Sequence, residues 1–269
     1  MVKANDPSAL DTLVNEVLSS SKYRDISPEL VRSIGMQELS KRRTIKEAVK
    51  STKSKLHQVG GAYLDERKEY RFWLDLLQFQ SPNRIALQQA CRQIMSQHAS
   101  TRERLPILDQ FYFQSLSGLA IHSVIDIACG LNPLAIPWMP LEKDAEYYAY
   151  DIYQNMMDFL GQYMQLLPIK GHAKVRDVLQ ACPTQSVDVA LVLKAIPCLE
   201  QVDKQAGYRL LRTLNAKHLV VSFPIHSLGG RNKGMATNYE AHFWELLDGE
   251  TWEVKRFEFA TELVFVVSK

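Results

Sequence analysis

Several common signatures are missing from this chain of 269 residues. Its cysteines form no C-x-x-C pair, which argues against a zinc cluster and against a disulfide framework; they are Cys91, Cys129, Cys182 and Cys198. No apolar run approaches the length of a membrane span, and no short apolar segment follows the N-terminus, so we expect neither membrane insertion nor secretion. Internal repeats and low-complexity stretches are also lacking. These absences favour a globular cytoplasmic protein without a metal, which we expect to be a monomer.

A glycine-rich phosphate loop is missing as well. The apolar run 124–127 leads into a turn that holds one glycine, Gly130, where a G-x-G-x-x-G motif has three. A dinucleotide presses its pyrophosphate against the backbone and needs those glycines, so NAD and FAD fit poorly. S-adenosyl-L-methionine carries no phosphate, and its pocket requires only one close approach of the backbone to the ligand, so we expect this cofactor. A turn with one glycine is also compatible with an ordinary connection from a strand to a helix.

Three spaced acids favour the cofactor interpretation. Asp126 lies inside the first apolar run, Asp151 ends a second one, and Asp177 follows the segment where a third strand is expected to end. In a doubly wound sheet the second acid binds ribose hydroxyls, and ligands gather at the carboxyl ends of the strands. Asp177 would accept a bond from the adenine amino group, although it is also suited to cap a helix. The residues next to these acids complete the expected cofactor site: Ala128, Ile152 and Val178.

The order of apolar runs predicts the fold. Runs at 187–193 and 217–223 add a fourth and a fifth strand, and segments 252–259 and 262–267 read as two adjacent strands joined by a short turn. Seven strands with a C-terminal antiparallel hairpin indicate an α/β, Rossmann-like class I methyltransferase domain. We assign it to residues 81–269, with a helical lead-in at 81–120.

The first 80 residues are predicted to form a separate helical domain. Helices are expected at about 8–19, 28–39, 44–59 and 63–79, and two more in the lead-in at 83–97 and 102–117. Residues 1–120 hold 18 Lys and Arg against 13 Asp and Glu, whereas residues 121–269 hold 14 against 17. The positive charge therefore belongs to the front of the chain.

Basic residues are concentrated between positions 22 and 57. In the helix expected at 44–59, apolar residues recur at helical spacing and the lysines form a separate stripe that only Glu47 interrupts. Such a stripe is often only a solvated face, but faces of that kind usually mix both signs. We therefore predict a surface that binds RNA phosphates. Its candidate residues are Lys22, Arg24, Arg42, Arg43, Lys46, Lys50, Lys53, Lys55 and His57.

Several segments resemble one enzyme family. They are Lys53-Ser-Lys-Leu-His-Gln-Val-Gly-Gly-Ala-Tyr63, His98-Ala-Ser-Thr-Arg-Glu-Arg104, Asp126-Ile-Ala-Cys-Gly-Leu-Asn-Pro-Leu134, Ser222-Phe-Pro224, Ser227-Leu-Gly-Gly-Arg-Asn-Lys-Gly-Met235, Asn238-Tyr239 and Glu262-Leu-Val264. Together they are similar to the aminoglycoside-resistance 16S rRNA guanine-N7 methyltransferases, in the order of that family and over nearly the whole chain. The resemblance implies methyl transfer to a guanine in the decoding region of the 30S subunit, with an N-terminal helical domain docked on folded 16S rRNA.

The implied chemistry agrees with the lack of an obvious catalytic base. Guanine N7 has an in-plane lone pair and no proton at neutral pH, so it attacks the methyl group in line without a general base. The enzyme then has to supply proximity and alignment, and contacts that favour the reacting geometry. Because the deep major groove of RNA hides N7, the target base has to be unstacked or presented by distorted rRNA.

The segment after the fifth strand is expected to meet the substrate. Glycines present Arg231, Lys233, Met235 and Asn238 there, and the resemblance supports Arg231, Met235 and Asn238 in handling the base. Lys233 is assigned to RNA binding. Tyr239, Phe243 and Trp244 are available for stacking, but for Phe243 and Trp244 we favour the buried face of a helix.

Two further charged residues are candidates near the cofactor. By the resemblance, Arg104 would bind the cofactor's carboxylate bidentately; without it, an ion pair with Glu103 or another acid on a helix surface would be preferred. Lys194 follows the fourth strand, where many methyltransferases carry substrate-facing residues, and is equally compatible with a lysine at the rim. His98 is interpreted as structural.

Two other functions remain open from the sequence. One is a methyltransferase that acts on another RNA site or on a small molecule. The other is a non-catalytic RNA-binding scaffold with a similar fold, against which the presence of all three acids argues.

Overall fold

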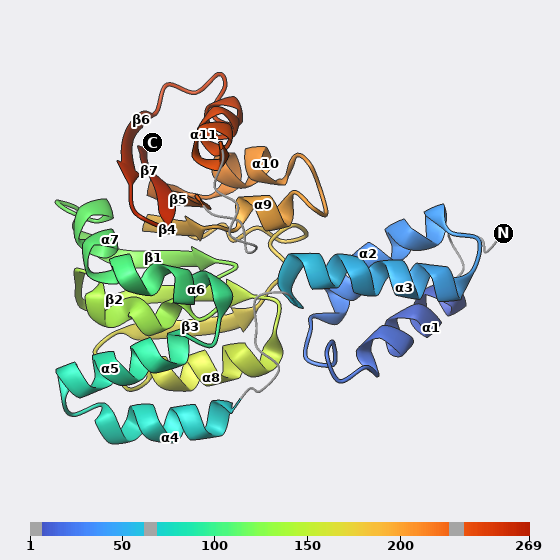
Figure 1. Cartoon of the computed structure of the whole chain (residues 1–269), viewed down its shortest axis with the longest axis horizontal. Coiled ribbons are helices and arrows are strands. Elements are labelled where there is room, and N and C mark those ends of the chain that lie inside the picture. Colours follow the sequence, from blue (N-terminus) through green and yellow to red (C-terminus); the bar gives the residue numbers. More distant parts are fainter. Residues whose placement is uncertain (1–6, 62–68, 226–233) are drawn as a thin grey trace.

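A computed structural model describes residues 7–61, 69–225 and 234–269 of the chain. Within these ranges seven strands form one sheet in the order β3-β2-β1-β4-β5-β7-β6 (Figure 1). Neighbouring strands are parallel except that β7 runs antiparallel to β5 and β6. The strands are β1 (Ile121–Ile127), β2 (Leu141–Asp151), β3 (Lys170–Val175), β4 (Val187–Leu193), β5 (Ala216–Pro224), β6 (Glu253–Glu258) and β7 (Glu262–Ser268).

Helices cover both faces of this sheet. The central strand β4 is buried along its whole length, as expected for a parallel strand that is covered on both sides. Its side chains alternate: Val189 and Leu191 belong to one hydrophobic cluster, and Ala190 and Val192 belong to the other. The first cluster includes α5 (Arg84–Met95), α7 (Leu108–Ser115) and α8 (Gln154–Met164); the second includes α9 (Ile196–Leu199), α10 (Ala206–Thr213) and α11 (Met235–Leu246).

A group of three helices stands beyond the carboxyl ends of β1, β2 and β3 (Figure 1). This N-terminal bundle consists of α1 (Pro7–Leu18), α2 (Pro28–Lys41) and α3 (Ile45–Leu56), which pack on one another, and it continues into the π-helical turn η1 (His57–Gly61). The hydroxyl of Ser27 caps α2 and that of Thr44 caps α3, each by accepting a backbone N–H three residues on. Gly35 allows α1 and α2 to approach closely, since a Cβ there would lie 2.5 Å from Leu13.

The structure confirms the seven predicted strands and the antiparallel pairing at the C-terminus. Two helix predictions were wrong in detail. The helix expected at 63–79 is α4 and begins at Tyr70; residues 62–68 lie outside the described ranges. The helix expected at 102–117 is broken into α6 (Ala99–Arg104), the 3-10 turn η2 (Leu105–Ile107) and α7. Pro106 explains the break, because proline lacks the N–H and its ring clashes with the preceding turn.

Helix α4 (Tyr70–Gln80) packs on α5 and α8, next to the sheet. By these contacts it belongs with the helices that cover the sheet, whereas the predicted division at residue 80 groups it with α1, α2 and α3. Within the described ranges, every helix is too short or too polar to cross a membrane.

Candidate functional site

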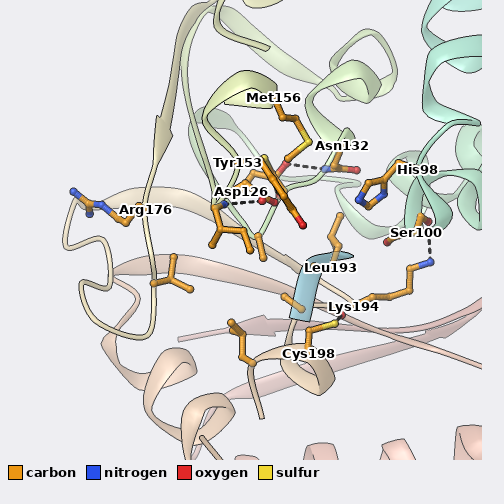
Figure 2. A pocket seen from close by; sticks show the side chains of 18 of the residues that line it. His98, Ser100, Asp126, Asn132, Tyr153, Met156, Arg176, Leu193, Lys194 and Cys198 are labelled. Carbon is orange, nitrogen blue, oxygen red and sulfur yellow. Dashed lines mark hydrogen bonds between the residues drawn. The ribbon is translucent and has the colours of Figure 1, made fainter. Parts of the chain in front are cut away.

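A pocket opens at the carboxyl ends of β1, β2 and β4, with about 910 Å³ of empty space including its mouth (Figure 2). Parallel strands bring their carboxyl ends to one edge of a sheet, so residues far apart in sequence meet there. The predicted residues that line it are Arg104, Asp126, Ala128, Asp151, Ile152, Asp177, Val178 and Lys194. The structure thus brings together nearly the whole predicted cofactor set around a single cavity.

Asp126 is fully buried at the end of β1. Its Oδ2 accepts hydrogen bonds from Asn132 Nδ2 at 2.9 Å and from the Tyr147 hydroxyl at 2.7 Å. Its Oδ1 has no hydrogen-bond partner among the described residues. Burial raises the pKa of Asp126 to about 6, against the opposing effect of the two hydrogen bonds.

Gly130 and Asp151 are joined directly. The Gly130 N–H donates to Asp151 Oδ2 at 2.9 Å, and the Ile152 N–H donates to Asp151 Oδ1 at 2.7 Å. Gly130 has φ +51, and a Cβ on it would lie 2.7 Å from the ring of His98. The backbone conformation therefore favours glycine here, and the close approach of His98 leaves little room for a Cβ. His98 supports the turn, in agreement with the structural role predicted for it.

Asp177 begins a turn after β3. Its Oδ1 accepts the Leu179 N–H at 3.0 Å, so the carboxylate organises the turn that carries Val178. The other oxygen, Oδ2, is buried and has no hydrogen-bond partner among the described residues. Burial raises the pKa of Asp177. One oxygen thus serves the turn while the second has hydrogen-bonding capacity left.

Arg104 forms a buried ion pair with Glu262, the first residue of β7. Its Nε lies 2.9 Å from Glu262 Oε1, and its Nη2 donates to Oε2 at 2.9 Å; Nη1 donates to Asn132 Oδ1 at 2.8 Å. The alternative of an ion pair with an acid is therefore confirmed in part: the partner is Glu262, and the pair is buried instead of lying on a helix surface. A guanidinium has five N–H groups, so these bonds leave donors on an arginine that lines the pocket.

Lys194 extends from the end of β4 toward α6, as Figure 2 shows. Its ammonium donates to the Ser100 carbonyl at 2.8 Å and to Glu103 Oε2 at 2.8 Å, and lies 3.4 Å from Glu262 Oε1. Lys194 is buried and has φ +57, a left-handed conformation that is costly for a non-glycine residue. Lys194 is thus buried and paired with acids, and does not lie exposed at the rim of the pocket. Its role in substrate positioning stays a prediction.

The substrate segment is described only in part. Arg231 and Lys233 lie outside the described residues. Met235 is half-buried at the start of α11, Asn238 is exposed one turn later, and neither is among the residues that line the pocket. Their contact with a base stays a prediction.

The aromatic side chains of α11 do not all face inward. Phe243 is buried and stacks on Phe265 with centroids 3.8 Å apart, which confirms the prediction for this residue. Trp244 is 49% exposed, so its predicted burial was wrong. Adjacent residues on a helix point about 100° apart, so Phe243 faces the sheet directly while Trp244 meets the same Phe265 ring only edge-on, with centroids 6.2 Å apart. Tyr239 stacks on Phe223.

The predicted RNA-binding residues within the described ranges lie on α3, in η1 and in the segments that precede and follow α2; together they are called the basic surface of α2 and α3. Arg24, Arg43, Lys46, Lys50 and His57 are exposed, Lys53 and Lys55 are half-buried, and Lys22 is exposed with its ammonium 3.1 Å from His57 Nδ1. A shallow hollow at the α2–α3 turn is lined by Lys41, Arg42, Arg43, Glu47, Lys50, Ser51 and Ser54.

Two of these basic residues also have a structural role. Glu38 is buried and bonds to Arg42, with Nη2 at 3.1 Å, and to Lys55, with Nζ at 2.9 Å. Burial would raise the pKa of Glu38, but the two cations hold it below its usual value. Arg42 and Lys55 therefore stabilise the bundle, and the charge they offer to a partner is reduced.

Sequence reasoning missed several residues in and around the site. Asn132 links Asp126 to Arg104, and Glu262 is the counter-ion of Arg104 and Lys194. Leu30 and Gly60 come from the N-terminal bundle and also line the pocket. An acid at the start of an otherwise apolar strand was the available signal for Glu262; no local pattern pointed to Leu30.

The chain is similar to known proteins over nearly its whole length. The family model described as ribosomal RNA methyltransferase (FmrO) matches residues 19–266. A 16S rRNA (guanine(1405)-N(7))-methyltransferase of Micromonospora rosea is 35% identical and aligns over 100% of both chains. One of the same name from Frankia casuarinae is 38% identical over 97% of this chain and 94% of the relative.

Two solved structures of 16S rRNA methyltransferases are also similar to this chain. The crystal structure of the 16S rRNA methyltransferase RmtF in complex with S-adenosyl-L-homocysteine has a TM-score of 0.85 and 31% sequence identity, and covers 98% of this chain and 100% of that one. The 16S rRNA methylase RmtB has a TM-score of 0.79 and 29% identity over 98% of this chain and 100% of its own. The chain therefore belongs to the ribosomal RNA methyltransferase (FmrO) family.

Proposed function

We propose that this protein transfers a methyl group from S-adenosyl-L-methionine to N7 of the guanine in the decoding region of 16S rRNA that its relatives modify, within the 30S subunit. The observation that carries the proposal is the convergence of Asp126, Asp151 and Asp177 at the Gly130 turn, in a chain of the ribosomal RNA methyltransferase family. The RmtF structure supports the cofactor assignment, because it contains the demethylated product of the same molecule. The cytoplasm is then the site of action, and a monomer suffices.

The donor set of the pocket suits this cofactor. The unpaired oxygens of Asp126 and Asp177 are buried acceptors, and such atoms are rare unless a ligand or water satisfies them. Asp151 would hold the ribose hydroxyls, Asp177 the adenine amino group and Arg104 the carboxylate. Ala128, Ile152 and Val178 would form the walls, and Gly130, which does not itself line the pocket, would hold Asp151 in place through its N–H. In the part of the chain that the structure describes, no group of three or more His, Cys, Asp and Glu side chains could hold a metal ion.

The bound cofactor supplies an electrophilic methyl group on a sulfonium. Because guanine N7 has no proton to lose, the residues around the pocket need only bind and orient the two reactants. His98 fits a binding site without a general base. Burial lowers its pKa to about 3, so the ring is neutral, and it packs under the Gly130 turn. Preorganised contacts of this kind act by proximity and alignment.

The basic surface of α2 and α3 supports an RNA substrate. Exposed Arg43, Lys46 and Lys50 are free of acidic partners within the described ranges, so they are available to phosphates. Met235, Asn238, Lys194 and the undescribed Arg231 and Lys233 remain the candidates for contact with the target base and its backbone.

The decisive experiment is to incubate the protein with 30S subunits and labelled cofactor and then to map the modified nucleotide. We expect methylation of one guanine at N7, found by mass spectrometry of nuclease fragments and by chain cleavage after reduction. Expression in a sensitive bacterium is expected to protect it from 4,6-disubstituted deoxystreptamine aminoglycosides. Modification of a neighbouring adenine, or of free nucleosides and not of 30S subunits, would replace this proposal with another target.

A further inference from the structure

The N-terminal bundle is attached to the sheet immediately after Asp151. The Ser27 N–H donates to the Ile152 carbonyl at 2.8 Å, and the Gln154 N–H donates to the Asp25 carbonyl at 2.8 Å. Between these bonds, Ile26 and Tyr153 form an isolated antiparallel bridge. The segment that carries the predicted ribose-binding acid therefore continues directly into a short backbone pairing with the bundle.

Side chains add two contacts to this joint. Asn155 Nδ2 donates to Asp25 Oδ2 at 2.8 Å. Gln180 Nε2 donates to Ser33 Oγ at 2.7 Å, and Gln180 belongs to the turn that Asp177 organises. The bundle thus contacts the segments behind both acids that are predicted to hold the nucleoside.

The bundle also reaches the pocket itself. Leu30 of α2 and Gly60 of η1 are among the lining residues. Gly60 is tightly placed, because a Cβ on it would lie 3.0 Å from the Tyr153 hydroxyl and 3.1 Å from Ile152 Cδ1. Turn η1 also packs on α9, whose Cys198 and Leu199 line the same pocket. Residues of the bundle therefore close one side of the cavity.

We propose that the N-terminal bundle is part of the cofactor site, so that cofactor binding and the orientation of the bundle relative to the sheet are coupled. The proposal rests on the function proposed above and adds a regulatory link to it. A ligand that contacts both parts stabilises the arrangement in which both contacts exist, and by reciprocity anything that holds this arrangement tightens the ligand. The cofactor-bound enzyme thus presents the basic surface of α2 and α3 at a fixed orientation to the pocket.

Hydrogen exchange tests the coupling in the full-length protein, with S-adenosyl-L-homocysteine as the probe. We expect the probe to slow exchange of the Ser27 and Gln154 amides, and of the first turn of α2, as well as of the turns at Gly130 and Asp177. Protection confined to the sheet, with unchanged exchange at residues 25–35, would overturn the coupling and leave the proposed function intact. No binding of the probe by the wild-type protein would instead overturn the proposed function.

A pair of variants gives a second readout. Asp25→Ala removes the acceptor of Asn155 without touching a lining residue, and we expect the affinity for S-adenosyl-L-homocysteine to fall at least about 5-fold, within the usual range of coupling between sites. Asp11→Ala is the matched control: it removes an exposed acid of the same bundle, bonded to Arg32 at 2.7 Å, and is expected to leave the affinity unchanged.

Circular dichroism and the melting temperature show whether Asp25→Ala folds. If it does not, Ser33→Ala tests the Gln180 contact in its place, with the same expected direction. Wild-type affinity in a folded joint variant would contradict the proposal.

Discussion

Arg104 and Glu262 are 158 positions apart in the chain and form a fully buried ion pair in which both carboxylate oxygens are engaged. Burial alone would raise the pKa of Glu262, but Arg104 and Lys194 hold it below its usual value. The Ser222 hydroxyl donates to Oε2 at 2.8 Å as well. This pair ties α6 to the first residue of β7 beside the pocket.

Replacing Glu262 with glutamine is expected to destabilise the protein by about 3–5 kcal/mol, since it leaves the buried charge of Arg104 without its anion. The free energy of unfolding in urea, measured for both proteins, checks this. Glu240→Gln is the control, because Glu240 pairs with Arg256 at the surface and its loss should cost less than about 1 kcal/mol. Similar values for the two variants would show that the buried pair is not stabilising.

Asp126 is expected to make stability depend on pH. Its pKa is about 6 in the folded protein and about 3.9 in an unfolded chain, so folding favours the protonated acid. The stabilisation is fully present below about pH 4 and is lost as the pH rises through 6. Relative to Asp126→Asn, the wild type should therefore lose up to about 3 kcal/mol between pH 4 and pH 7. Denaturant titrations of both proteins across this range measure it; a constant difference would contradict it.

Gly130→Ala should lower the stability of the protein for two separate reasons, and Gly118→Ala for one. Both glycines have positive φ, which costs an alanine about 1–2 kcal/mol, but a Cβ at Gly118 has nothing within 4 Å. At Gly130 the Cβ meets the His98 ring, so we expect a further loss of about 1–3 kcal/mol and weakened cofactor binding. Thermal melts and calorimetry with S-adenosyl-L-homocysteine compare the two. Equal losses of stability in the two variants would mean that His98 moves away from the new Cβ without a loss of free energy.

Charge reversal on the bundle should affect the ribosomal subunit and spare the cofactor. Arg43→Glu combined with Lys50→Glu is expected to weaken 30S binding about 10-fold or more at low salt, and to reduce the salt dependence by roughly one unit per lost phosphate contact. Arg42 is avoided, since a glutamate there would face the buried Glu38 and disturb the fold. Filter binding at several salt concentrations gives both quantities.

The matched control is Lys143→Glu with Lys170→Glu. It makes the same change of charge at the amino ends of β2 and β3, away from the pocket. Equal effects of the two double variants would show that only the total charge matters.

The converse variant is Asp151→Ala. We expect the affinity for S-adenosyl-L-homocysteine to fall about 10-fold to 100-fold, the effect of losing a charged hydrogen-bond acceptor, while the basic surface itself is unchanged. Calorimetry measures the affinity. Asp203→Ala, which removes an exposed acid paired with Arg209, is expected to bind normally. Wild-type affinity in Asp151→Ala would remove this residue from the site.

The sheet and its pocket were predictable because their signals are local. An apolar run followed by an acid or a glycine reports both a strand and the edge where it ends, and Asp126, Asp151 and Asp177 all met at the pocket. Helix boundaries were less accurate, although Pro106 was a local signal for the break between α6 and α7.

Contacts across the chain could not be predicted in the same way. The sequence around Arg104 does not indicate that Glu262 is its partner. The sequence around Arg42 and Lys55 does not indicate that Glu38 is buried between them. Helical spacing likewise did not tell that Phe243 is buried whereas its neighbour Trp244 is 49% exposed. Such pairings depend on how the elements pack, which a single sequence does not display.

Ala128 and Lys194 share the left-handed backbone of Gly130, at the ends of the adjacent strands β1 and β4. Residues with a Cβ keep this conformation only when their surroundings enforce it, so we expect the backbone at these strand ends, where the crevice has its floor, to be rigid before any ligand arrives. An inhibitor that matches this floor loses little binding energy to rearrangement of the protein.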